Sequence, residues 1–119
     1  MGASVATVLI VDDNQDVRDY LRLLFHIDGF AVIGEAADGI EAAIIASELG
    51  PDLVIMDHLM PRRSGDKTAA VIRATVPQAH ILAYSAVLDR KPEWADGFVS
   101  KGQIAELLPA ARKLLAVTH

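Results

Sequence analysis

Five polar side chains that could act together chemically each come soon after a short apolar run of the sequence. Two acids follow the first run, a third acid follows residues 53–56, and a hydroxyl and an ammonium follow two later runs. These side chains are Asp12, Asp13, Asp57, Ser85 and Lys101. If the runs are neighbouring strands, the three carboxylates lie close together and repel each other unless a cation lies between them. The set therefore predicts a cation site, and oxygen ligands of this kind suit Mg²⁺.

The same set contains the groups that phosphoryl transfer requires. Asp57 directly follows four apolar residues, and a carboxylate held beside a metal ion is a nucleophile that can form an acyl phosphate. Lys101 can neutralise a phosphoryl oxygen, and Ser85 can donate a hydrogen bond to another. Because phosphoryl transfer asks mainly for positioning and charge stabilisation, these residues predict phosphoryl transfer to Asp57.

Unbroken apolar runs predict the strands that bring these side chains together. The runs show no alternation of polar and apolar residues, which is typical of strands buried on both faces of a parallel sheet. We expect strands at residues 5–11, 30–35, 53–56, 80–84 and 97–100. We expect helices at about residues 15–28, 39–49, 66–76 and 103–117. This alternation predicts an α/β fold, a doubly wound parallel sheet of five strands with helices on both faces and the carboxyl ends of all strands at one edge.

Local signals mark the starts and the buried faces of the helices. Asn14 and Asp38 are expected to cap the first two helices, because their side chains accept hydrogen bonds from the free N–H groups of a first turn. We expect the second helix to bury Ile40, Ala43 and Ile44. The two caps place the start of a helix soon after each of the first two strands.

Two places disturb this regular pattern. Residues 86–96 can supply one helical turn at most. Pro109 lies inside the apolar stripe of the last helix, and its missing N–H should bend that helix or delay its effective start. We therefore expect irregular structure between the fourth and fifth strands and before the last helix.

Composition is typical of a single globular domain over residues 1–119. Hydrophobic residues make up 52% of the chain and charged residues 23%, which argues against disorder. The chain has no cysteine, which excludes disulfides and fits a reducing cytoplasm. The net charge of −5, without a basic run, argues against a nucleic-acid surface. No apolar segment approaches the ~18 residues of a membrane helix and no secretory signal is visible, so we expect a cytoplasmic domain without a membrane contact.

The stretches around the five side chains resemble the receiver domain of response regulators in two-component signalling. The resemblance covers Val-Leu-Ile-Val-Asp-Asp-Asn at 8–14, Asp-Leu-Val-Ile-Met-Asp-His-Leu-Met-Pro at 52–61 with Gly65, Ser-Ala at 85–86, and Gly-Phe-Val-Ser-Lys at 97–101. It implies a flavodoxin-like sheet with the strand order 2-1-3-4-5. It also implies a phosphorylation-dependent switch that takes its phosphoryl group from a histidine kinase or a histidine phosphotransfer protein and acts on a downstream effector that the sequence does not name.

The resemblance assigns roles around the acceptor. Asp57 corresponds to the phosphoacceptor. Asp13 corresponds to a direct ligand of Mg²⁺ (or Mn²⁺), and Asp12 to an acid that acts on the metal ion mainly through water. The backbone carbonyl of His58 corresponds to a further metal ligand.

The remaining matches concern the switch. Ser85 corresponds to the switch hydroxyl and Lys101 to the phosphate-binding lysine. Phe98 matches the aromatic switch position, whose ring in the family turns inward when the hydroxyl moves toward the phosphate. The resemblance thus implies a domain that catalyses its own phosphoryl acceptance and slow hydrolysis and is not an enzyme acting on other substrates.

Three features depart from the family pattern. The interval from Ser85 to Lys101 is several residues shorter than in typical receivers, which predicts a short, displaced or missing fourth helix and a remodelled version of the surface through which receivers often dimerise. Gly102 stands where a proline commonly follows the lysine. His58 is a bulky, titratable side chain beside the acceptor, where it could alter access or the rate of dephosphorylation.

Three other functions fit parts of the pattern. A Mg²⁺-dependent phosphatase with an aspartyl-phosphate intermediate would usually carry a second acid two residues after the nucleophile, where this chain has Leu59. A degenerate receiver that acts only as an interaction module is disfavoured by the complete set of acids, hydroxyl and lysine. A nucleotide-binding site ranks last because no Gly-rich loop follows the first strand.

Taken singly, most of these residues also have a structural interpretation. Asp12 and Asp13 suit the N-terminus of a helix, where acids interact favourably with the helix dipole. Ser85 suits a turn, and Phe98 suits the core. Phosphoryl chemistry is indicated only by the complete set, in which the acids, the hydroxyl and the lysine all follow strands of the same predicted sheet.

Overall fold

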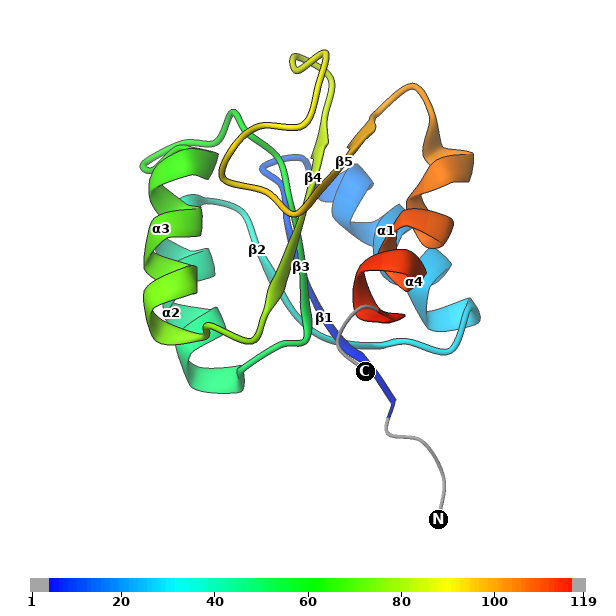
Figure 1. Ribbon diagram of the computed structural model, residues 1–119, viewed down its shortest axis with the longest axis horizontal. Coiled ribbons are helices and arrows are strands. Elements are labelled where there is room, and N and C mark those ends of the chain that lie inside the picture. Colours follow the sequence, from blue (N-terminus) through cyan, green and yellow to red (C-terminus); the bar gives the residue numbers. More distant parts are fainter. Residues whose placement is uncertain (1–4, 117–119) are drawn as a thin grey trace.

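A parallel β-sheet forms the centre of the molecule, with helices on both of its faces (Figure 1). The structure is a computed structural model that describes residues 5–116. Within this range the sheet has five strands in the order β2-β1-β3-β4-β5, and each neighbouring pair is parallel. The strands are β1 (Thr7–Val11), β2 (Ala31–Ala36), β3 (Leu53–Met56), β4 (His80–Ser85) and β5 (Gly97–Ser100). This order confirms the predicted doubly wound, flavodoxin-like fold.

Among the described residues, two helices cover each face of the sheet (Figure 1). The first face carries α1 (Gln15–Ile27) and α4 (Leu107–Ala116), and the second carries α2 (Gly39–Leu49) and α3 (Gly65–Thr75). Each face has its own cluster of buried apolar side chains. None of the helices in residues 5–116 is both long and apolar enough to cross a membrane.

β3 is buried on both faces because its side chains alternate between these two clusters. Val54 and Met56 pack in the cluster under α2 and α3, whereas Leu53 and Ile55 pack in the cluster under α1 and α4. Each such burial favours folding by roughly 1.5–3 kcal/mol, before the entropy cost of ordering the chain. β3 is therefore a firm support for Asp57, which follows it directly.

The two predicted helix caps are confirmed. The Asn14 side chain accepts hydrogen bonds from the N–H groups of Asp16 at 2.9 Å and Val17 at 3.2 Å. The Asp38 side chain accepts from the N–H of Glu41 at 2.8 Å. These bonds satisfy N–H groups that have no partner within the helix. The cap of α1 also fixes the path of the chain directly after β1.

The predicted buried face of α2 is wrong at Ile44, whose surface is 54% exposed. The buried positions of α2 are small residues, namely Gly39, Ala42, Ala43 and Ala46. The reason is the close contact between α2 and α3. A Cβ atom placed on Gly39 would lie 2.2 Å from the Thr68 hydroxyl oxygen, so only a residue without a side chain fits there. At this separation alanines fill the interface, and the larger isoleucine turns outward.

Residues 86–96, all of which the structure describes, form no helix between β4 and β5. This confirms the prediction of a short, displaced or missing fourth helix, and of these three the structure shows that the helix is missing. The segment (hereafter the β4–β5 loop) instead packs Trp94 and Ala95 on the core cluster under α2 and α3. Apolar side chains of a loop therefore cover part of this face of the sheet.

The last helix begins later than residue 103. A 3₁₀ turn at Ile104–Glu106 precedes α4, which starts at Leu107. Pro109 is the third residue of α4, where its missing N–H removes no bond within the helix. The predicted delay of the helix start is confirmed. Residue 117, the expected end of this helix, lies outside the described residues.

Candidate functional site

The register of the sheet places the predicted site residues at one edge. Val11 of β1 pairs with Met56 of β3, so the residues that follow them, Asp12 and Asp57, lie side by side. The N–H of Asp57 donates to the carbonyl of Val11 at 3.1 Å, which continues the ladder one residue beyond the strand. The carboxyl ends of β1 and β3 therefore bring two acids together, as expected for parallel strands.

The last strand brings a cation to these acids. Ser85 pairs with Ser100, and the N–H of Lys101 donates to the carbonyl of Ser85 at 3.2 Å. The Lys101 ammonium then lies 2.7 Å from Asp12 Oδ2 and 3.0 Å from Asp57 Oδ2. Asp12 is 2% exposed and Asp57 8% exposed, so both carboxylates are largely withdrawn from water. Side chains that are far apart in sequence thus form one compact charged site.

Two opposing effects act on the pKa of Lys101. Partial burial lowers the pKa, because the charged form loses hydration. Hydrogen bonds to Asp12 and Asp57 and the charges of both carboxylates raise it by more, so the pKa of Lys101 lies above its ordinary value. The ammonium is therefore fully charged at neutral pH and offsets the two acids.

The acids also form a set of ligands that could hold a metal ion. One carboxylate oxygen from each of Asp12, Asp13 and Asp57 lies within 4.8 Å of the others. Asp13 is exposed, so it leaves room for metal-bound water at the solvent side of the site. Hard oxygen ligands with accessible water suit Mg²⁺, and the residues present fit such an ion. The His58 carbonyl, the further expected ligand, already accepts a hydrogen bond from the N–H of Gly65 at 2.9 Å.

Arg18 supports the acidic pair from the first turns of α1. Its Nη1 donates to the backbone carbonyl of Asp12 at 2.7 Å, and its Nε lies 3.3 Å from Glu35 Oε1. The N–H of Asn14 adds a bond to Asp12 Oδ1 at 2.9 Å. Our reading of the sequence missed Arg18. The signal that would have identified Arg18 is its position, one helical turn after the cap residue Asn14, which itself follows the two acids.

Ser85 and Phe98, the predicted switch residues, occupy two different environments. Ser85 is fully buried, and its hydroxyl oxygen accepts a hydrogen bond from the N–H of Val87 at 3.2 Å. A hydroxyl that accepts one bond still has its own hydrogen to donate. Phe98 is half-buried and packs against the core cluster under α2 and α3. The hydroxyl is therefore joined to the start of the β4–β5 loop, and the phenyl ring lies on the same face as that loop.

The sequence was compared with models of known protein families, and one family matches most of the chain. Residues 8–111 match the model of the response regulator receiver domain. The chain belongs to this family. The match runs from the second residue of β1 through β5 and the first half of α4.

Curated relatives agree with this family. A putative transcriptional regulator of Pseudomonas aeruginosa is 37% identical, over 94% of this receiver and 58% of that protein. The chemotaxis protein CheY of Halobacterium salinarum is 33% identical, over 79% of this receiver and 82% of that protein. The receiver thus spans little more than half of the first relative and most of the second.

Solved structures show the same fold. The response regulator domain of Thermotoga maritima CheB superposes with a TM-score of 0.86 at 25% identity, covering 95% of this receiver and 98% of that chain. A chain of the CheX–CheY–BeF₃–Mg²⁺ complex from Borrelia burgdorferi superposes with a TM-score of 0.82 at 28% identity, covering 92% of this receiver and 88% of that chain. A chain of the complex of the CheA3 P1 domain with CheY6 from R. sphaeroides superposes with a TM-score of 0.78 at 30% identity, covering 96% of this receiver and 99% of that chain.

The β4–β5 loop of this receiver contacts the site at His58. The Trp94 indole stacks on the His58 imidazole with ring centroids 5.9 Å apart and the planes 13° from parallel. Trp94 is the only tryptophan of the chain. Sequence reasoning placed His58 beside the acceptor but did not predict its contact with Trp94, because no periodic pattern joins a loop residue to the end of a distant strand.

Proposed function

We propose that this receiver accepts a phosphoryl group on Asp57 and thereby changes its binding of a partner protein. The observation that supports this most directly is the Lys101 ammonium, 3.0 Å from the Asp57 carboxylate and 2.7 Å from Asp12. A nucleophilic carboxylate beside a fixed positive charge is what an incoming phosphoryl group requires.

The proposed reaction uses the residues of the site in named roles. An oxygen of Asp57 attacks the phosphorus of a phosphohistidine, the P–N bond breaks, and the imidazole leaves with the bonding electron pair. Lys101 stays near the acceptor and compensates charge on the phosphoryl oxygens. Water later attacks the phosphorus of the aspartyl phosphate, which releases inorganic phosphate and restores the Asp57 carboxylate. The domain is an acceptor in this reaction and not an enzyme acting on other substrates.

Mg²⁺ (or Mn²⁺) fits the oxygen ligands beside Asp57. Asp13 and Asp57 would bind it directly, Asp12 through water, and the His58 carbonyl with the lone pair that Gly65 does not use. When bound, the ion supplies a second positive charge for the phosphoryl oxygens and neutralises the acids.

The proposed switch starts at Ser85. Its hydroxyl would move to donate a hydrogen bond to a phosphoryl oxygen on Asp57. This movement would break the hydrogen bond that the hydroxyl oxygen now accepts from the N–H of Val87. Movement of Ser85 would then make room for the ring of Phe98 to turn inward. The consequence is a new conformation of the β4–β5 loop and of β5, to which a downstream effector would respond.

The partners we propose are proteins. The similarity to a receiver crystallised with a kinase P1 domain supports a sensor histidine kinase or a histidine phosphotransfer protein as the donor. The net charge of −5 supports protein partners over nucleic acid. The absence of cysteine and the phosphohistidine donor fit a cytoplasmic domain that does not insert into a membrane.

A phosphorylation assay tests this function. With Mg²⁺ and acetyl phosphate, we expect each chain to gain one phosphoryl group that is stable in acid and labile in base, measured by intact-protein mass spectrometry. Asp57→Asn should abolish the gain. Asp19→Asn, which changes an exposed acid on α1, should leave it unchanged and serves as the matched control.

Other outcomes would support the competing functions. Repeated turnover of small phosphate esters would identify a phosphatase. A chain that neither gains a phosphoryl group nor hydrolyses esters would be an interaction module. Either result would overturn the proposal.

A further inference from the structure

We propose that Trp94 is a positioning residue for phosphorylation: it holds His58, and the His58 backbone orients the Asp57 carboxylate. This inference rests on the proposed function, because it concerns the rate at which Asp57 accepts a phosphoryl group. It assigns a role in the site to the loop that replaces the fourth helix.

The first step is the orientation of the acceptor. The N–H of His58 donates to Asp57 Oδ1 at 2.7 Å, and the Lys101 ammonium lies 3.0 Å from Oδ2. Each carboxylate oxygen therefore has its own partner, and together the two bonds set the plane of the carboxylate. Because one of the two partners is a backbone N–H, the orientation of Asp57 depends on where the His58 peptide is held.

The second step is the position of His58 itself. Its carbonyl accepts from the N–H of Gly65 at 2.9 Å, and its imidazole stacks on the Trp94 indole. A Cβ atom on Gly65 would lie 2.9 Å from Trp94 Cζ2, 3.1 Å from the Asp57 carbonyl and 3.1 Å from His58 Cα. The indole thus reaches the start of α3 directly beside the backbone of the acceptor. His58 is therefore held at its backbone carbonyl and at its side-chain ring.

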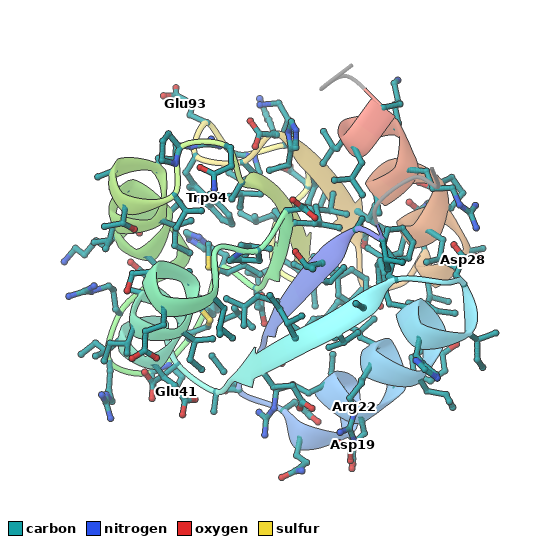
Figure 2. All side chains as sticks on the ribbon, turned by 90° about the horizontal axis from the view of Figure 1, so that it is seen from below. Asp19, Arg22, Asp28, Glu41, Glu93 and Trp94 are labelled. Carbon is teal, nitrogen blue, oxygen red and sulfur yellow. The ribbon has the colours of Figure 1, made fainter. Side chains whose placement is uncertain are left out.

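The third step is the support of Trp94. Arg73 of α3 donates from Nη2 to the Trp94 carbonyl at 2.8 Å and lies 3.2 Å from Asp96 Oδ1. Asp96 Oδ2 in turn accepts from the N–H of Ile81 in β4 at 2.8 Å. Figure 2 shows Trp94 turned into the molecule, whereas the neighbouring Glu93 points outward. The loop therefore presents the indole from a fixed position.

The chemistry of the stacked pair argues against simple core filling. His58 Nδ1 and Trp94 Nε1 are buried and have no hydrogen-bond partner among residues 5–116. A buried polar atom without a partner costs roughly 1–3 kcal/mol, which a pair of aliphatic side chains would avoid. Two stacked aromatic rings prefer a defined relative orientation, which aliphatic side chains do not, so the indole can fix the orientation of the imidazole.

Removal of the indole tests the proposal. Trp94→Ala should lower the rate constant for phosphorylation by acetyl phosphate at saturating Mg²⁺ by about 10-fold or more, because small errors in the position of reacting groups are costly. Trp94→Phe keeps a flat ring and should restore most of the rate. The rates are compared at saturating Mg²⁺ because Asp57 and the His58 carbonyl are themselves proposed ligands of the ion, so the Mg²⁺ concentration for half-maximal rate should rise as well.

A matched variant separates positioning from stability. Phe30→Leu removes an aromatic edge contact with Phe25, whose ring centroid is 5.1 Å away in the cluster under α1 and α4. We expect it to lower stability and to leave the phosphorylation rate within about twofold of the wild type. An equal loss of rate in Phe30→Leu would show that the effect of Trp94 is general destabilisation, and would overturn the proposal.

A second variant tests the route through His58 and remains informative if Trp94→Ala does not fold. His58→Ala removes the ring and keeps the backbone N–H, so it should reproduce the slow phosphorylation of Trp94→Ala. The double variant should be no slower than either single variant, because both changes remove the same contact. A wild-type rate in His58→Ala, or losses that multiply in the double variant, would overturn the inference. A wild-type chain that gains no phosphoryl group would overturn the proposed function as well.

Discussion

Lys101 lies between two carboxylates that would otherwise repel each other. Its distances of 2.7 Å to Asp12 and 3.0 Å to Asp57 are those of charge-assisted hydrogen bonds. Asp12 is almost completely buried and the lysine side chain is 22% exposed, so water screens this pair less than a surface pair. The lysine therefore serves the folded state as well as the proposed reaction.

Replacement of Lys101 by Met keeps the length of the side chain and removes its charge. We expect the free energy of unfolding to fall by about 2 kcal/mol, because Asp12 then stays buried beside Asp57 without a cation. Mg²⁺ should recover part of this loss by supplying positive charge at the same acids. Urea unfolding with and without Mg²⁺ measures both effects, and Lys67→Met, at an exposed position of α3, is the control. Equal stability of Lys101→Met and the wild type without Mg²⁺ would contradict the prediction.

The pH dependence of this contribution follows from the raised pKa of Lys101. A group whose pKa is higher in the folded state stabilises that state fully below its unfolded pKa, about 10.4 for lysine, and loses this effect as the pH rises through the folded value. The stability difference between the wild type and Lys101→Met should therefore be constant through neutral pH and shrink only in the strongly alkaline range. A difference that already shrinks near neutral pH would show that the charge of Lys101 is not its source.

Sequence alone predicted the acids, the hydroxyl and the lysine because each lies at the end of a strand or within two residues after it. In a parallel sheet that position is enough to gather them at one edge. It did not predict the contacts of Arg18 with Asp12 or of Trp94 with His58. Those contacts depend on the path of a loop and on the rotation of a helix, which no local pattern specifies.

At the scale of elements, the strands were the easiest to predict. β3 and β4 consist mainly of apolar residues that fill both core clusters, so composition and pattern agree. α2 was harder, because isoleucines and alanines alternate around it without a clear apolar stripe. The close approach of α3 decides which side is buried, and this approach depends on Gly39 and Thr68.

Gly39→Ala tests this contact between α2 and α3. The added methyl group would lie 2.2 Å from the Thr68 hydroxyl oxygen and 2.3 Å from the Arg63 carbonyl oxygen, so one helix must shift. We expect a loss of about 3 kcal/mol in the free energy of unfolding, measured in urea. Gly102→Ala is the matched control, because its nearest atom would be Ser100 Oγ at 3.9 Å, and it should change stability by less than about 0.5 kcal/mol. Equal stability of the two variants would contradict the contact.

At the scale of the whole molecule, the absence of a helix in residues 86–96 changes one surface. The loop with Trp94 and Ala95 lies between β4 and β5, where typical receivers have their fourth helix. Receivers often dimerise through the surface that this helix shares with the last strand and the last helix. That surface therefore has a different shape in this receiver, as the short interval from Ser85 to Lys101 predicts. The path of the loop that replaces the helix could not be predicted from the sequence.

We expect phosphorylation not to cause this receiver to dimerise through that surface. The dimer of other family members needs contacts from a helix that residues 86–96 do not form. Light scattering of the protein with Mg²⁺, before and after addition of acetyl phosphate, measures the mass directly. A doubling of the mass that depends on Asp57 would be the contrary result.

The strand order has a consequence for a chain that is still being synthesised. β2, β1 and β3 are adjacent in the sheet and all lie within the first 56 residues, so these three strands are synthesised well before Lys101. Lys101 follows the edge strand β5 and joins last. A chain that ends before β5 would lack the ammonium partner of Asp57, so the proposed phosphoryl acceptance depends on completion of the sheet.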